Sequence, residues 1–140
     1  YHWFDVIGVK LIYPNGTVNH YGGAIRSDGV GFHPHQFSLN IGLNQPLETA
    51  YVTGPGMIIK KYVWEKIKYD FQFQQYIDVD FCFQAREKGF KVGVIPVTII
   101  HSEGEDGFKI RTPELQMQML KENHEKFTAK WMNKLAECIK

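Results

Sequence analysis

The segment from Tyr76 to His101 constrains the fold most strongly, because in it a helix leads through a glycine into an apolar strand. Residues 78–88 have the spacing of a helix with one apolar face, and Gly89 is placed to end it. Its inward-facing side chains are predicted to be Phe81, Cys82 and Ala85. The apolar run from 90 to 100 is typical of a strand, and Pro96 predicts that this strand ends there or lies at a sheet edge. A helix followed by such a strand predicts an α/β fold.

A hairpin is predicted near the beginning of the chain. Residues 6–13 alternate as a strand does, with Ile7, Val9 and Leu11 on one face. Pro14-Asn15-Gly16 is a strong turn signal, and residues 17–20 form the returning strand. The next stretch, 21–47, contains scattered glycines and prolines without a period, which predicts a functional loop or lid. Residues 51–53 then have the pattern of a short buried strand.

Two further helices are expected. A short one falls within residues 57–67, and a longer one begins at Thr112 with a capping side chain and a proline in its first turn. The longer helix is predicted to end near Lys126, with Phe127 and Trp131 anchoring the segment beyond it.

The composition excludes several classes of protein. A chain of 140 residues that is 44% apolar and carries a net charge of +1 is expected to form one globular domain without a surface for nucleic acid. Its apolar runs are shorter than a membrane span, and its start has no signal-peptide pattern. Cys82 and Cys138 are predicted to be free thiols in a reducing, cytoplasmic compartment. Because Tyr1 opens almost directly into an apolar run, we expect this sequence to be a piece of a longer protein.

Asp78 and Asp80 are the main candidates for chemistry. Both fall at the predicted start of a helix, whose partial positive charge favours an ionised aspartate that can accept a proton from a hydroxyl. A structural alternative makes one of them a helix cap and the other a favourable first-turn charge, worth about 1 kcal/mol together. His101, at a strand end, is either a metal or phosphate ligand or a structural residue.

Other candidates give weaker signals. His33 and His35 flank a proline with no further ligand at a suitable spacing, so a mobile loop with incidental histidines is the better interpretation. His20 is expected to be a hydrogen-bonding structural residue. Gly54 and Gly56 are small enough for a ligand to approach the backbone, but they match no phosphate-binding fingerprint.

Several short motifs follow one another along the chain. They are Gly8 to Thr17 with His20 and Gly22, Thr53 to Met57, Tyr69 to Phe73, Ile77 to Asp80, Gly89, His101, and Asn123 with Phe127, Lys130 and Trp131. In this order and spacing they resemble the C-terminal half of a family 2 glycosyltransferase of the GT-A fold. The resemblance covers nearly all of the chain.

The resemblance implies a particular architecture and activity. The chain would be the C-terminal part of a GT-A-type (nucleotide-diphospho-sugar transferase) fold, a mixed sheet with flanking helices. Residues 1–140 would form one partial domain that lacks the N-terminal nucleotide-binding half and is inactive alone. The complete, hexosyltransferase-like enzyme would transfer a sugar from a nucleotide-sugar, most often a UDP-sugar, to a hydroxyl of a saccharide or other acceptor. Cell-surface polysaccharide biosynthesis and peripheral membrane association through the parent protein would fit this activity.

The resemblance also assigns roles to residues. Asp78 would be the general base, and His101 would bind the divalent metal, Mn²⁺ or Mg²⁺, that holds the donor diphosphate. Substrate binding would fall to Thr53, Gly54, Gly56, Met57 and Asp80.

The sequence departs from the family pattern at two informative positions. Ile77 stands where the family has Glu, and Gln84 stands where Arg is common. These departures favour an alternative, a non-catalytic carbohydrate-binding or scaffold module that retains the fold. A metal-dependent hydrolase using Asp78, Asp80 and His101 is a third hypothesis.

Overall fold

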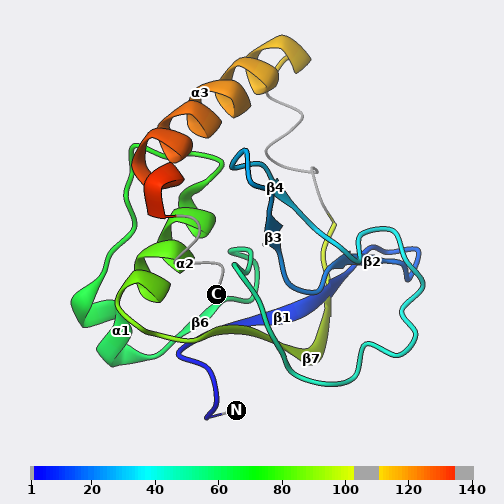
Figure 1. The fold of residues 1–140 in the computed structure, drawn as a ribbon. Coiled ribbons are helices and arrows are strands. Elements are labelled where there is room, and N and C mark those ends of the chain that lie inside the picture. Colours follow the sequence, from blue (N-terminus) through cyan, green and yellow to red (C-terminus); the bar gives the residue numbers. More distant parts are fainter. Residues whose placement is uncertain (1, 103–110, 135–140) are drawn as a thin grey trace.

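The computed structural model describes residues 2–102 and 111–134. They form a mixed α/β fold in which a curled sheet is flanked by helices (Figure 1). The strands are β1 (Val6–Ile12), β2 (Val18–His20), β3 (Ala24–Ile25), β4 (Gly31–Phe32), β5 (Leu47–Glu48), β6 (Ile58–Ile59) and β7 (Val92–Ile100). The helices are α1 (Lys61–Lys66), α2 (Ile77–Glu87) and α3 (Pro113–Trp131), followed by a 3₁₀ turn at Met132–Lys134. The predicted α/β class is therefore confirmed.

Strand β1 is the centre of the sheet. It pairs antiparallel with β2, which confirms the predicted hairpin, and also antiparallel with β6 and parallel with β7. The order across the main path is β2-β1-β7-β5. The first six residues of β1 are all buried, because the strand is covered on both faces. The alternation in its sequence therefore does not separate a solvent-exposed face from a buried face.

Strand β7 does not end at Pro96. It continues to Ile100, with its parallel register to β1 shifting between the pairs Val9–Ile95 and Lys10–Thr98. Pro96 lies within this irregularity, where the missing backbone N–H breaks no regular ladder bond. The predicted strand end at Pro96 is therefore wrong. The alternative, an edge position, agrees with the pairing, because beyond Val94 the described residues pair β7 with β1 alone.

The long segment after β2 is less irregular than its sequence indicates. It contains the small β3–β4 hairpin, and an isolated bridge joins Gly23 to Tyr51. Tyr51 and Val52 are buried as predicted, but no strand forms at 51–53. Val52 packs over Gly8, where an added Cβ would come within 2.6 Å of its side chain.

The helices begin and end close to the predicted positions, with two instructive differences. Helix α2 is preceded by Tyr76 without a side-chain cap, so neither aspartate is its N-cap. It ends as predicted before Gly89, which has a φ of +81°. Helix α3 is capped by Thr112 as predicted, but it runs to Trp131. None of the helices in the described ranges is long and apolar enough to cross a membrane.

Helix α3 packs on α2 through aromatic side chains. Phe83 of α2 lies edge-on to Phe127 and Trp131 of α3, with ring centroids 5.2 and 5.7 Å apart. All three side chains are buried, as are the predicted Phe81, Cys82 and Ala85. Phe127 and Trp131 are thus anchors, as predicted, but within the helix. The helix extends beyond Lys126 because this apolar stripe continues at helical spacing.

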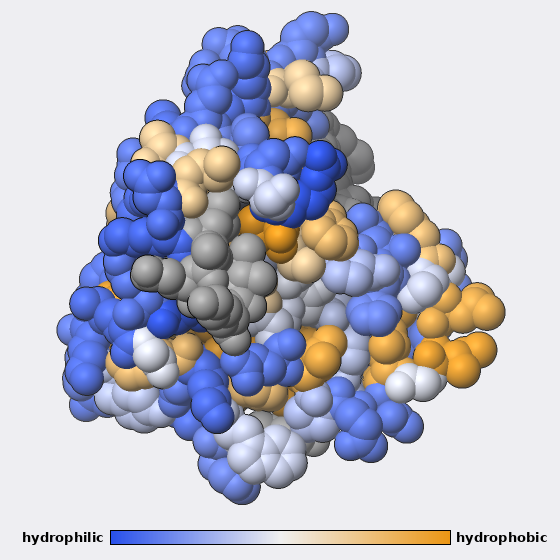
Figure 2. Space-filling model, in the orientation of Figure 1, coloured by the Kyte–Doolittle hydropathy of each residue, from blue (hydrophilic) through white to orange (hydrophobic). Residues whose placement is uncertain are grey.

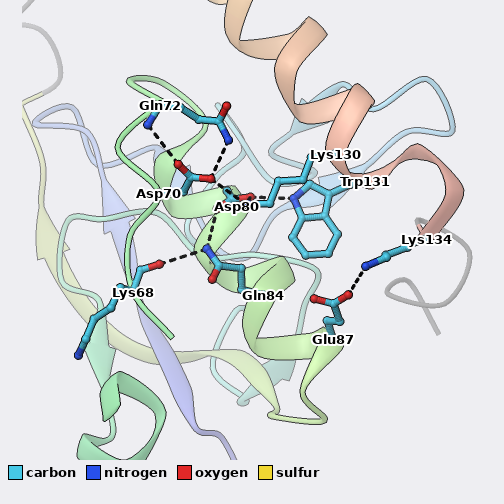
Figure 3. Close-up of polar contacts among 9 residues, drawn as sticks. All are labelled: Lys68, Asp70, Gln72, Asp80, Gln84, Glu87, Lys130, Trp131 and Lys134. Atoms are coloured by element: carbon cyan, nitrogen blue, oxygen red, sulfur yellow. Dashed lines mark hydrogen bonds and ion pairs between the residues drawn. The ribbon is translucent and has the colours of Figure 1, made fainter. Parts of the chain in front are cut away.

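Asp80 adds a polar link to the same interface, and Figure 3 shows its carboxylate directed toward α3. Asp80 is 0% exposed. Its Oδ1 accepts a hydrogen bond from Trp131 Nε1 at 2.7 Å and lies 2.8 Å from Lys130 Nζ. Its Oδ2 accepts from Gln84 Nε2 at 2.8 Å. Lys130 also contacts Asp70, and although burial alone would lower the pKa of Lys130, these two carboxylates raise it.

Replacing Asp80 with Asn should destabilise the fold. The partners of Asp80, which are Trp131, Lys130 and Gln84, all donate hydrogen bonds, and the amide N–H₂ of asparagine would face one of these donors. We expect a loss of roughly 2–4 kcal/mol in the free energy of unfolding, measured by urea denaturation. Asp70→Asn is the matched control, since it removes the more exposed partner of Lys130 and should cost less than about 1 kcal/mol. Equal effects of the two substitutions would contradict the assignment of Asp80 as the anchor of α3.

Candidate functional site: a pocket at the start of helix α2

A small pocket lies where α2 begins, between this helix, the segment after Tyr51 and the N-terminal half of α3. Its volume is about 170 Å³. The residues that line it include His33, Tyr51, Thr53, Gln75, Asp78 and Leu120. We call this cavity the Asp78 pocket. It brings together two of the predicted site residues, Thr53 and Asp78, from segments far apart in the sequence.

The carboxylate of Asp78 is held in place by backbone groups. Its Oδ2 accepts a hydrogen bond from the N–H of Gly54 at 3.0 Å, and its Oδ1 accepts from the N–H of Val79 at 2.8 Å. The first of these bonds ties the start of α2 to the turn at 53–56. An ionised carboxylate has about four acceptor positions, so each oxygen can still accept a proton or a hydrogen bond from a ligand.

Burial sets the protonation behaviour of Asp78. It raises the pKa above the ordinary value of 3.8, and the hydrogen bonds from Gly54 and Val79 only partly offset this shift. Burial therefore shifts the pKa of Asp78 in the direction opposite to the effect expected from the helix start. A raised pKa makes the carboxylate a stronger base, which suits proton abstraction from a hydroxyl.

Thr53 contributes a hydroxyl whose Oγ1 is buried and has no hydrogen-bond partner among residues 2–102 and 111–134. Beside it, Tyr51 donates a hydrogen bond to the carbonyl of Phe32 at 3.2 Å, and burial raises the pKa of the Tyr51 hydroxyl. Buried polar atoms in proteins are almost always paired, so an unpaired one in a cavity wall marks a place for a ligand or water atom. The Thr53 hydroxyl is such a group.

One of the residues that line the pocket, His33, contacts a second histidine, His20. The Nδ1 atoms of His20 and His33 are 2.7 Å apart, so one ring donates to the other. Burial, together with the charge of His33, lowers the pKa of His20 to about 3, and His20 is therefore neutral at ordinary pH. His20 is a buried structural residue, as predicted. His33 joins it rather than forming a pair with His35.

Gly56 and Met57 do not line the Asp78 pocket. Gly56 has a φ of +71°, and a Cβ added to it would lie 2.4 Å from Val9 Cγ2. It is therefore required by turn geometry and by packing against β1. The Met57 sulfur lies 3.7 Å from the Tyr69 hydroxyl. Of the glycines in this turn, only Gly54 contacts Asp78.

Asp80 and His101 also lie away from the pocket. The carboxylate of Asp80 faces α3 and is occupied by Trp131, Lys130 and Gln84. The backbone N–H of His101 donates to the carbonyl of Ile12 at 2.9 Å, at the end of β7. Figure 1 shows this end of β7 near β2 and well separated from α2. Within residues 2–102 and 111–134, no three His, Cys, Asp or Glu side chains are grouped to hold a metal.

Gln75 and Leu120 were not identified from the sequence, and Asn123 was named there only as part of a motif, without a role in the site. Gln75 and Leu120 line the pocket, and Asn123 of α3 positions the loop before α2 by accepting from the N–H groups of Gln74 and Gln75 at 2.7 and 3.4 Å. Asn123 is buried in line with Phe127 and Trp131. An asparagine in an otherwise apolar helical stripe is the signal that could have identified it.

A larger cavity of about 440 Å³ lies between β5, the segment 21–25 and Arg86. Its walls combine small residues with larger ones, among them Glu48 and Arg86. These two lie 3.7 Å apart, and Arg86 also donates to the carbonyl of Thr49 at 3.1 Å. The Asp78 pocket is the better functional candidate although it is smaller, because it combines a carboxylate of raised pKa with an unpaired hydroxyl.

No protein-family model matches this sequence, and no curated protein matches it significantly. The inference of function therefore rests on the chemistry of the pocket and on the motifs of the sequence.

The two glycines of the turn should respond differently to substitution. Gly54→Ala should leave the melting temperature nearly unchanged, because no atom lies within 4 Å of the added Cβ. Gly56→Ala should destabilise by roughly 1–3 kcal/mol, since it combines a positive φ with a clash against Val9. Thermal unfolding of both variants tests this. A Gly56→Ala protein as stable as Gly54→Ala would show that Gly56 is not a packing residue.

The raised pKa of Asp78 predicts a specific pH dependence. Because its pKa is raised, Asp78 binds a proton more tightly in the folded protein than in the unfolded chain. The folded state therefore loses stability as Asp78 ionises, while pH rises from the ordinary pKa of 3.8 through the raised pKa. The free energy of unfolding of the native protein should therefore fall relative to Asp78→Asn across this window. Urea denaturation at a series of pH values measures the difference.

Asp70 provides the control of opposite sign. The hydrogen bond from Lys130 lowers the pKa of Asp70, so the native protein should gain stability relative to Asp70→Asn as pH rises through the lowered and then the ordinary value. Parallel slopes for the two variants would contradict the environment described for Asp78.

Proposed function

We propose that this chain is the acceptor-side part of a GT-A-type glycosyltransferase, in which Asp78 is the general base. The observation that carries the proposal is the Asp78 carboxylate itself. The N–H of Gly54 orients this carboxylate, and burial raises its pKa. The same pocket contains the Thr53 hydroxyl, which has no hydrogen-bond partner among the described residues. The ordered motifs of the sequence support the same activity.

The chemistry assigned to the pocket is transfer of a glycosyl group to a hydroxyl. The acceptor hydroxyl donates to Asp78, which takes its proton while the acceptor oxygen forms a bond to the anomeric carbon of the donor. The bond between that carbon and the nucleotide diphosphate breaks, and the diphosphate leaves with the electron pair. The N–H groups of Gly54 and Val79 keep the carboxylate in one orientation throughout.

The donor in this proposal is a nucleotide-sugar, with a UDP-sugar the first to test, and the acceptor is a saccharide or another hydroxyl compound. The described residues do not assemble a metal site around His101. A Mn²⁺ or Mg²⁺ ion at His101 would need ligands from outside them, so no step is assigned to a metal. A cytoplasmic location accords with the free, buried thiol of Cys82.

A second candidate function is a non-catalytic carbohydrate-binding or scaffold module. The presence of Ile77 in place of the family's glutamate favours it. In that case the Asp78 pocket would bind a saccharide without turnover. The hydrolase hypothesis has less support, because Asp80 is committed to α3 and His101 lies outside the pocket.

Replacing Asp78 with Asn in the complete protein should lower kcat by about 10²–10⁴-fold, the usual cost of removing a positioned base, while donor affinity changes little. Sugar transfer from UDP-sugars to saccharide acceptors is the measurement. Asp70→Asn is the control, because it also removes an aspartate but lies outside the pocket. Normal turnover by Asp78→Asn would refute the base assignment. Acceptor binding without turnover in the native protein would establish the binding-module alternative.

A further inference from the structure

The N-terminal half of α3 presents an apolar groove that continues from the Asp78 pocket. Among the described residues the groove is lined by Gln75, Pro113, Gln116, Met117 and Leu120, and its volume is about 470 Å³. We call it the α3 groove. Figure 2 shows apolar surface among polar surface in this part of the molecule, and Met117 and Leu120 are 68% and 43% exposed.

The periodicity of α3 explains how the groove arises. Asn123, Phe127 and Trp131 form the stripe of α3 that is buried against the rest of the fold. The same helical spacing continues toward the N-terminus through Leu120 and Met117. The apolar face of the helix is therefore longer than the surface that the described residues place against it.

The α3 groove and the Asp78 pocket adjoin each other, because Gln75 and Leu120 line both. The pocket alone, at about 170 Å³, is smaller than the roughly 300–1,000 Å³ of most small-molecule sites. With the groove added, the space falls inside that range. A ligand that occupies the pocket therefore has room to extend along α3.

The two compartments differ in chemistry. The pocket offers the Asp78 carboxylate and the Thr53 hydroxyl, which is buried and unpaired. The groove offers mainly the side chains of Met117, Leu120 and Pro113. A hydroxyl group fits the first compartment and an alkyl or prenyl chain fits the second, where leaving water is favourable.

We propose that the natural acceptor is amphipathic, with a hydroxylated head that binds in the Asp78 pocket and an apolar chain that lies in the α3 groove. This inference rests on the proposed function and names the class of its acceptor. Methionine suits such a groove, because its flexible side chain adapts to chains of different shape.

The experiment compares two probes with the same head, n-octyl β-D-glucoside below its critical micelle concentration and methyl β-D-glucoside, by calorimetry on the complete protein. Octyl glucoside should bind at least about tenfold more tightly, because only it can bury methylene groups in the groove. Met117→Gln and Leu120→Gln should both remove this difference. Met117→Gln should also leave methyl glucoside binding unchanged, because Met117 lines the groove and not the Asp78 pocket.

Leu115→Gln is the matched control. Leu115 is 45% exposed, close to the value for Leu120, and belongs to the same helix, but it does not line the groove. It should leave the affinities for both probes unchanged. Circular dichroism checks that all three variants fold.

Three binding results would overturn the proposal. They are the absence of saturable octyl glucoside binding, equal affinity for the two probes, and octyl glucoside binding that Met117→Gln and Leu120→Gln leave intact. A dimer dissociated by Met117→Gln in sedimentation would also overturn it, since the groove would then be covered by a second copy. If the proposed function itself were wrong, the result would be different: Asp78→Asn would keep the turnover of the native protein.

Discussion

The buried carboxylate of Asp80 is the interaction on which the site depends. It holds Trp131 and Lys130, and with them the C-terminal half of α3, against α2. Further along α3, Asn123 accepts the backbone N–H groups of the loop that leads into α2. The start of α2 is therefore fixed from both sides, by its own packing and by a side chain of the neighbouring helix. Without Asp80, the wall that carries Gln75 and Leu120 would lose its support.

Asp78 and Asp80 show how one turn of helix can hold two carboxylates with different tasks. Asp80 points into the α2–α3 interface, where donors from three side chains satisfy it. Asp78 lines the pocket, where the backbone N–H groups of Gly54 and Val79 donate to it and burial raises its pKa. The two carboxylates therefore differ in their partners, side chains for Asp80 and backbone groups for Asp78.

Local structure was largely predictable from the sequence. The β1–β2 hairpin, the end of α2 at Gly89 and the cap of α3 at Thr112 follow from turn and capping residues that act over a few positions. These features were identified because their causes lie next to them in the chain.

The site was less predictable, because its contacts join distant segments. The passage of β7 through Pro96 depends on a bulge against β1, and the role of Gly56 depends on Val9. The contact between His20 and His33 could not be inferred from either histidine alone. Asp78 and Thr53, both named as candidates through the resemblance, line one pocket, whereas the position of Asp80 required knowledge of α3.

The parallel pairing of β1 with β7 has a consequence for how the chain acquires its fold. The β1–β2 hairpin can form early, because its strands are close in sequence. The contact between Asp5 and Lys91 at the start of the β1–β7 pair spans 86 positions, and such long loops close slowly. During synthesis, one edge of β1 therefore stays unpaired until β7 has left the ribosome. The interval exposes an apolar strand edge, and chaperone binding is expected to be concentrated there.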